Sequence, residues 1–177
     1  MSLKELLKNR KSYRHNFTDR KITKDELQYL MEAAYLAPSG CNLQSSRVIG
    51  VLDQDKLDKL AEIFGFAWAK TATAAIVIVT KPMALEGKGP SRHKEDFGAA
   101  AQNLWLAITD LGLATTWIQG QIENEKGEQM AEVLKVPGDY KVSGYFPIGE
   151  PSRETVGPKK MPFEVRCFLD EFGAEFK

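Results

Sequence analysis

The sequence has few of the residues that build metal centres and disulfide frameworks. Its 177 residues include two cysteines, Cys41 and Cys167, and two histidines, His15 and His93. The cysteines are too few and too far apart along the chain for a disulfide framework or a zinc site. So few histidines also argue against a His-based metal centre or a Ser-His-Asp triad. We therefore expect no metal ligands in this chain.

Net charge is also lacking, because 24 Lys and Arg balance 24 Asp and Glu. A neutral chain has no overall attraction to nucleic acid or to anionic membranes. The longest apolar run, 74–79, has the length of a strand, whereas a membrane span needs ~20 residues. Residues 1–5 become acidic without an apolar stretch, which argues against a signal peptide. We predict a cytoplasmic protein with no membrane and no nucleic-acid partner.

The composition, 43% apolar and 27% charged, is typical of a globular domain, and we expect one domain over 1–177. Helical periodicity and capping residues predict helices after Ser2 and over 23–37, 53–64, 95–111 and 125–135. Short runs rich in β-branched residues predict strands over 48–52, 74–80, 114–118 and 142–148. Alternating helices and strands indicate a layered α/β domain.

A cluster of cations follows the first predicted helix. The segment Arg10-Lys11-Ser12-Tyr13-Arg14 combines three cations with a hydroxyl group, and a guanidinium can hold a phosphate with two hydrogen bonds. Taken alone, the cluster is better explained as a solvated basic patch. Residues 1–24 hold eight basic and two acidic side chains, so a nucleic-acid-binding arm is an alternative.

A loop rich in amides connects a predicted helix to a predicted strand. It has the sequence Ala37-Pro38-Ser39-Gly40-Cys41-Asn42-Leu43-Gln44. Each Asn or Gln amide offers a donor and an acceptor side by side, which suits the edge of a heteroaromatic ring. An ordinary turn is the competing interpretation, because Pro, Ser and Gly are common in turns.

Two further segments are candidates for ligand contact. Gln119-Gly120 follows a predicted strand, where ligands often bind in α/β sheets, and Lys159-Lys160 lies in a turn bounded by prolines. Each segment is also explained by a plain turn or by surface lysines. The Gly-x-Gly-x-x-Gly, P-loop and Gly-x-Ser-x-Gly motifs are missing from the sequence.

In their order and spacing, these motifs together resemble the nitroreductase family of flavin enzymes, over most of the chain from Leu6 to Pro162. The family begins with a helix that ends in Arg-Arg/Lys-Ser-x-Arg, and then has a helix that ends in Ala-Pro-Ser before an Asn and Gln loop. The segment 95–104 resembles its central dimer helix, and 111–117 resembles the strand entry that follows. The resemblance implies a mostly antiparallel sheet flanked by helices, in an intertwined homodimer.

The resemblance also implies FMN at the dimer interface, with NADH or NADPH as reductant and a nitroaromatic or quinone as small-molecule acceptor, in a ping-pong mechanism. It assigns cofactor contacts to Arg10, Lys11, Ser12, Arg14, Gln119, Gly120, Lys159 and Lys160 of one subunit, and to Pro38, Ser39 and Asn42 of the other, with Gln44 nearby. The chemistry would be carried by the flavin, with no catalytic side chain. Trp105 and Ala107, on another side of the long helix from its apolar stripe, favour a dimer that buries this helix on more than one face.

The chain departs from the family pattern at several positions. Ser45-Ser46 follows Gln44 where the family often has Pro-Trp, Met161 stands in an Arg place, and Glu150 replaces an aromatic residue. The segment 81–94 is expected to be a mobile loop that could cover the pocket. A flavin-binding protein without turnover is an alternative function.

Overall fold

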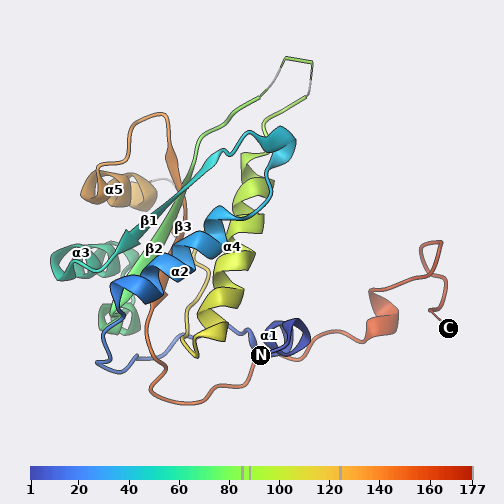
Figure 1. Ribbon diagram of the computed structural model, residues 1–177, viewed down its shortest axis with the longest axis horizontal. Helices are drawn as coiled ribbons and strands as arrows, with labels where there is room; N and C mark the ends of the chain where they lie inside the picture. The colour runs from blue at the N-terminus through green and yellow to red at the C-terminus, as the bar shows by residue number, and fades with distance from the viewer. Residues whose placement is uncertain (85, 88, 124, 177) are drawn as a thin grey trace.

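The computed structural model describes residues 1–84, 86–87, 89–123 and 125–176. Three strands form one antiparallel sheet in the order β1-β2-β3, namely Ser46–Val51, Ala74–Thr80 and Lys141–Ile148 (Figure 1). The central strand β2 is buried at every residue. The bounds of β2 agree with the prediction because an unbroken apolar run of this length is typical of a strand covered on both faces.

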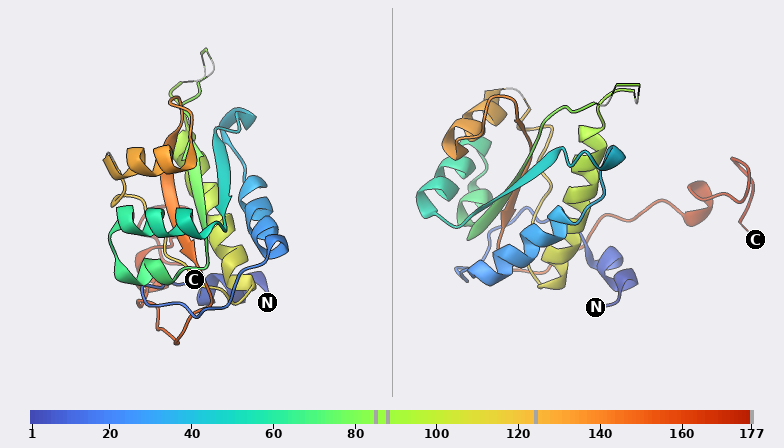
Figure 2. Two further views of the ribbon diagram at one scale, coloured as in Figure 1. Left: turned by 90° about the vertical axis from the view of Figure 1, so that its left-hand side faces the viewer. Right: turned by 45° about the horizontal axis from the view of Figure 1, so that its top comes forward.

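Helices cover both faces of the sheet (Figures 1 and 2). On one face, α2 (Lys24–Tyr35) and α4 (His93–Asp110) pack on Ile76 and Ile78. On the other face, α3 (Gln54–Phe64) and α5 (Glu125–Leu134) pack near Val77 and Val79. Alternate residues of β2 therefore serve two separate cores, as a three-layer domain requires.

The helix starts follow the capping residues that the sequence contains. Ser2 and Glu5 form a capping box at α1 (Leu3–Asn9), and Thr23 and Glu26 form another at α2. Asp53 caps α3, which ends at Gly65 in the left-handed conformation. Each cap satisfies amide groups of the first turn that have no partner within the helix. Among the described residues, no helix is both long and apolar enough to cross a membrane.

The predicted strand over 114–118 is wrong. This segment makes two isolated bridges, from Ile118 to Tyr145 of β3 and from Ala114 to Gly149 just after β3, but it forms no ladder. The register of these two bridges sets residue 116 opposite Pro147, which has no N–H to donate. The Thr115 hydroxyl donates to the Pro147 carbonyl at 2.8 Å, and the Thr115 carbonyl accepts from the Tyr13 backbone N–H at 2.9 Å.

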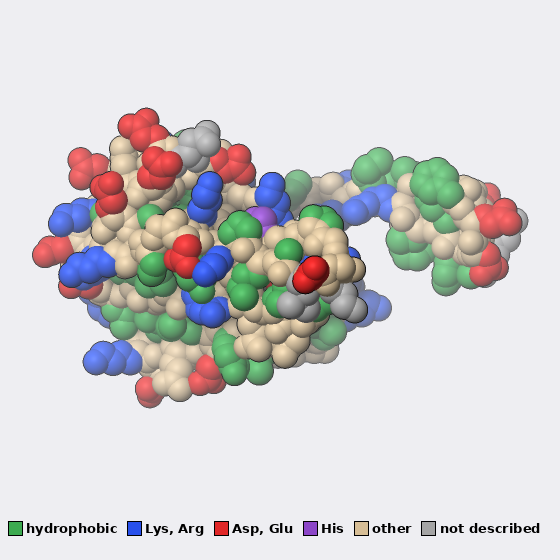
Figure 3. Space-filling view, turned by 90° about the horizontal axis from the view of Figure 1, so that it is seen from above, with side chains coloured by type: hydrophobic (Ala, Val, Ile, Leu, Met, Phe, Trp, Pro, Cys, Tyr) green, Lys and Arg blue, Asp and Glu red, His purple; other side chains and the backbone are tan. Residues whose placement is uncertain are grey.

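Residues after Pro151 leave the layered body as an extended tail, with one short 3₁₀ turn at Phe163–Val165 (Figures 1 and 2). Hydrophobic side chains gather on the tail, at the right of Figure 3. Among them, Val156 is 98% exposed and Phe172 is 95% exposed. The predicted loop 81–94 joins β2 to α4, and its residues 85 and 88 lie outside the described residues.

Candidate functional site

The cationic segment begins where α1 ends, at the start of an irregular stretch. Arg10 caps the C-terminus of α1, and its guanidinium carbon lies 4.2 Å from the ring centroid of Trp105 in α4. The Lys11 ammonium group donates a hydrogen bond to the Thr155 carbonyl. Arg14 is exposed and Ser12 is half-buried. Among the described residues, no ion pair with a carboxylate involves these cations, so their charge is available to an anion.

Tyr13 holds the start of the tail next to the cationic segment through hydrogen bonds. Its ring is buried, and its hydroxyl donates to the Asn16 carbonyl at 2.7 Å and accepts from the Ser152 amide at 2.9 Å. Farther along, a Cβ on Gly157 would lie 3.4 Å from the Cβ of Lys11. Lys159 and Lys160, both exposed, follow within two or three residues. The tail therefore carries two more cations past the cationic segment.

Gln119 is linked to the cationic segment through two tryptophans. The Trp117 indole donates to the Gln119 side-chain oxygen at 3.1 Å, and the Trp117 and Trp105 ring centroids are 6.2 Å apart. Arg10 lies on the ring of Trp105. Gly120 borders open space, because no atom of the other described residues, its two chain neighbours apart, lies within 4 Å of a Cβ built there. Residues from the N-terminal segment and from 119–120 thus share one region around α4.

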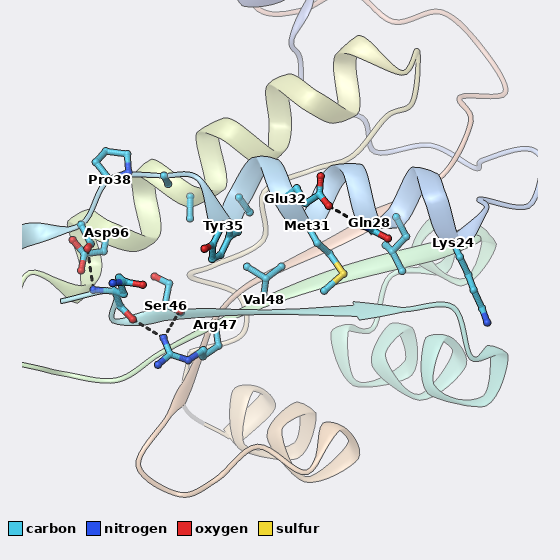
Figure 4. Close-up of a pocket in the computed structure, with 16 residues that line it drawn as sticks. Lys24, Gln28, Met31, Glu32, Tyr35, Pro38, Ser46, Arg47, Val48 and Asp96 are labelled. Carbon is cyan, nitrogen blue, oxygen red and sulfur yellow. Dashed lines mark hydrogen bonds between the residues drawn. The ribbon is translucent and has the colours of Figure 1, made fainter. Parts of the chain in front are cut away.

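The amide-rich loop lies at the N-terminal end of α4, whereas Arg10 lies on Trp105, nearer the C-terminal end. Pro38, Ser39 and Gln44 are among the residues that line a groove of about 670 Å³ between α2 and β1. Pro38 lies toward one end of the residues drawn in Figure 4, and Lys24 lies toward the other. The Ser39 hydroxyl accepts from the Gln44 backbone N–H at 2.9 Å. Asn42 is exposed and has a positive φ of 55°.

The two groups of predicted contacts do not meet within one chain. The loop bonds to Asp96, whereas Arg10 lies on Trp105 of the same helix. From Asp96 to Trp105 the helix makes about two and a half turns and rises about 14 Å, so the two side chains leave it on opposite sides. Within one chain, the loop and Arg10 therefore lie on opposite sides of α4.

The structure shows which residues of α4 are buried within one chain and which are left open. Trp105 and Ala107 were expected to need a partner, but both are already buried within the chain, at 8% and 6% exposure. Trp105 packs against Trp117 from the irregular segment between α4 and α5. The open face of α4 consists of half-buried residues instead, among them Gly98 and Ala99. The helical periodicity of the sequence identified the apolar positions of α4. It did not show which of them are buried within a single chain.

Sequence reasoning missed three residues that build this region. Asp96 is a buried carboxylate that bonds to the loop, Ser45 is its buried partner, and Trp105 is the platform for Arg10. Asp96 did carry a signal, because it shares a helical face with Ala100 and Leu104, and a carboxylate on a buried stripe needs hydrogen-bond donors.

Glu150, one of the departures from the family pattern, ties the N-terminal segment to the end of β3. Its carboxylate accepts from the Thr18 hydroxyl at 2.8 Å and lies 3.9 Å from the Arg20 guanidinium. Arg20 also bonds to Glu26 at 2.5 Å. Backbone hydrogen bonding at Thr23, and then Arg20, lower the pKa of Glu26. Part of the basic character of residues 1–24 is thus neutralised within the chain.

Three cavities adjoin the candidate residues. Besides the groove at the loop, a cavity of about 420 Å³ lies between Lys11, Trp105 and Arg153, and one of about 730 Å³ includes Gln119 and Phe97. Within the described part of the chain, no three His, Cys, Asp or Glu residues gather as metal ligands. Cys41 and Cys167 are both free thiols.

The sequence model of the nitroreductase family matches this chain over residues 7–82 and 66–150. The chain belongs to the nitroreductase family. A protein of Archaeoglobus fulgidus, named provisionally as an NADH dehydrogenase/NAD(P)H nitroreductase, is 31% identical over 139 residues, which are 78% of this chain and 79% of that protein. The family expected from the motifs is therefore confirmed.

Solved nitroreductases have the same fold. An FMN-dependent nitroreductase from Clostridium difficile is 29% identical, with a TM-score of 0.79 and coverage of 94% of this chain and 98% of that one. A Parabacteroides distasonis structure, provisionally named as an NADH dehydrogenase/NAD(P)H nitroreductase, is 27% identical, with a TM-score of 0.81 and coverage of 95% and 97%. The predicted antiparallel sheet flanked by helices is confirmed.

Proposed function

We propose that this protein is an FMN-dependent oxidoreductase that works as a homodimer of single-domain chains. FMN, when bound, takes a hydride from NADH or NADPH and passes electrons to an acceptor such as a nitroaromatic or a quinone, in ping-pong order. The observation that carries the proposal is the line of contacts from Gln119 through Trp117 and Trp105 to Arg10. These contacts bring the Gln119 side-chain amide and the Arg10 guanidinium into one region of the fold.

The side chains available fit the chemistry of FMN. Arg10, Lys11 and Arg14 supply cations for a phosphate and for the electron-rich end of the ring, and Ser12 supplies a hydroxyl group. Lys159 and Lys160 add two cations from the tail. Gln119 supplies an amide, and the Gly120 backbone borders open space. All of these residues are cationic or neutral, as an anionic cofactor requires.

The second subunit would complete the site. In our proposal Pro38, Ser39, Asn42 and Gln44 come from the partner, because one chain holds them on the far side of α4 from Arg10. The tail supports a second copy independently. A segment with Val156 and Phe172 almost fully exposed has apolar area to bury, and a partner offers the surface for it.

The cavity that includes Gln119 is the proposed place for reductant and acceptor. It has a volume of about 730 Å³, within the size range of small-molecule sites. His93 and Lys94, from the first turn of α4, also line it. Both partners of a ping-pong reaction would use this one cavity in turn.

The test is the visible absorption spectrum of the purified protein, before and after anaerobic NADH or NADPH. A flavin spectrum that bleaches rapidly supports the proposal. A flavin that binds but does not bleach indicates the alternative of a carrier or sensor without turnover. A protein that stays colourless with added FMN contradicts the cofactor assignment. Salt-sensitive duplex binding would then indicate the nucleic-acid alternative.

A further inference from the structure

The loop that enters β1 has an unusual backbone. Three residues that are not glycine have positive φ, namely Cys41 at 52°, Asn42 at 55° and Gln44 at 50°. This conformation is disfavoured for L-residues and persists only where the surroundings fix it. Two of the three, Asn42 and Gln44, belong to the proposed cofactor-binding set.

One buried carboxylate holds both ends of this loop. Asp96 is 6% exposed, and its two oxygens bond to different loop residues. Oδ1 accepts from the Gly40 amide at 2.7 Å, and Oδ2 accepts from the Ser45 hydroxyl at 2.6 Å. Ser45 is itself 2% exposed, and its carbonyl accepts from the Lys81 amide at 3.1 Å. The strained residues lie between these two points of attachment.

The position of Asp96 suits this task. It lies in the first turns of α4, where the helix dipole favours a negative charge, and its own amide bonds to the Arg92 carbonyl at 2.9 Å. Hydrogen bonds to a buried carboxylate are charge-assisted and short, so they resist the relaxation of the loop. The side chain of Arg92 also packs on Gly40, because a Cβ there would come within 2.9 Å of it.

We propose that Asp96 and Ser45 are positioning residues, which hold the loop 40–45 in the conformation that presents Asn42 and Gln44 to the cofactor of the partner subunit. The proposal rests on the proposed function for the identity of that cofactor. Ser45 stands where the family often has proline. A hydrogen bond to Asp96 therefore fixes in this chain a position that a pyrrolidine ring restrains elsewhere.

Two variants and a matched control for each test the proposal. Ser45→Ala removes one attachment without changing charge, and Ser45→Thr keeps the hydroxyl group. Asp96→Asn removes the charge at both attachments, and Glu95→Gln removes the same charge from an exposed side chain next to it. We expect Ser45→Ala and Asp96→Asn to weaken FMN binding about tenfold or more. Ser45→Thr and Glu95→Gln should stay within about twofold of wild type.

A readout without cofactor separates this proposal from the proposed function. Hydrogen exchange of the apoprotein should show faster exchange at the amides of residues 42–45 in Ser45→Ala and Asp96→Asn, with unchanged exchange in the core of β2. Wild-type exchange in both variants would overturn the positioning role, whatever the protein binds. Equal loss in Glu95→Gln would overturn it too, because a general charge effect would then explain the result. If the wild-type protein takes up no FMN, the proposed function fails, and the exchange data still decide whether Asp96 holds the loop.

Discussion

On one side of α4 the amide-rich loop is tied at both ends to Asp96, whereas on the other side Arg10 rests on the face of Trp105. The loop side is fixed by buried, charge-assisted hydrogen bonds. The cation side is fixed through backbone and aromatic contacts, which leave Arg14 exposed and the charges unpaired among the described ion pairs. The hydrogen bonds to Asp96 fix the conformation of the loop before a ligand binds. The contacts of Arg10 leave the cationic groups available to an anion.

The difference explains why one helix can serve a site that one chain does not complete. The proposed contacts of the loop side are amide and hydroxyl groups, whereas those of the other side are mostly cations. A ligand with an anionic end and a hydrogen-bonding ring needs both kinds. Two copies related by a twofold axis would bring unlike sides together and would make two equal sites.

The largest effect is expected on the cation side. Arg14→Ala removes an exposed guanidinium that we assign to FMN, and a charge-assisted hydrogen bond lost there should weaken FMN about 10- to 100-fold and slow flavin reduction. A fluorescence titration of FMN measures the change. Lys4→Ala, which removes an exposed cation of α1, should leave affinity unchanged. Equal affinity in wild type and Arg14→Ala would remove Arg14 from the site.

A smaller effect is expected from the platform beneath Arg10. Trp105→Leu should weaken FMN several-fold, because Arg10 loses the ring that orients it, and should cost about 2–3 kcal/mol of folding stability. Trp105→Phe keeps an aromatic face and should recover most of the affinity. Urea unfolding and FMN titration measure the two effects separately. Full affinity in Trp105→Leu would show that stacking on Trp105 does not orient Arg10.

The smallest effect is expected away from both sides of α4. Hydrogen bonding at Thr23 and the neighbouring Arg20 lower the pKa of Glu26, so its contribution is present above the unfolded-state pKa and is lost as pH falls through the lowered folded-state pKa. Glu26→Gln should cost about 1 kcal/mol or less at pH 7 and less again in acid, with FMN affinity unchanged. Urea unfolding of the wild type and of Glu26→Gln, at pH 7 and below the lowered pKa of Glu26, measures the cost in each condition. An equal cost at both would contradict the role of the charge.

Local sequence signals predicted much of the fold. The capping boxes at Ser2 and Thr23 and the apolar run of β2 act within a few residues, so the elements lie close to their expected positions. The prediction of a strand over 114–118 was wrong because the formation of a ladder there depends on Pro147, which is near in space but distant in sequence. The bonds from Asp96 to the loop likewise join residues more than fifty positions apart.

Motifs located the candidate residues in the sequence but not their arrangement. The order of the motifs is a property of the chain and led to the correct family. That Arg10 and Asn42 belong to opposite sides of α4 depends on the packing of three layers, which periodicity alone does not fix. The burial of Trp105 by Trp117 is another tertiary contact that the helical pattern could not reveal.

A mixed dimer tests the shared site most directly. One chain carries Arg10→Ala and Arg14→Ala, the other carries Asn42→Asp, which tolerates the left-handed backbone but replaces an amide donor with a carboxylate. Each variant alone should bind little FMN. Differently tagged chains, refolded together and purified through both tags, should regain about half of the wild-type flavin content, because one of two sites is intact. A mixed dimer as empty as its parents would show that each site is built within a single chain.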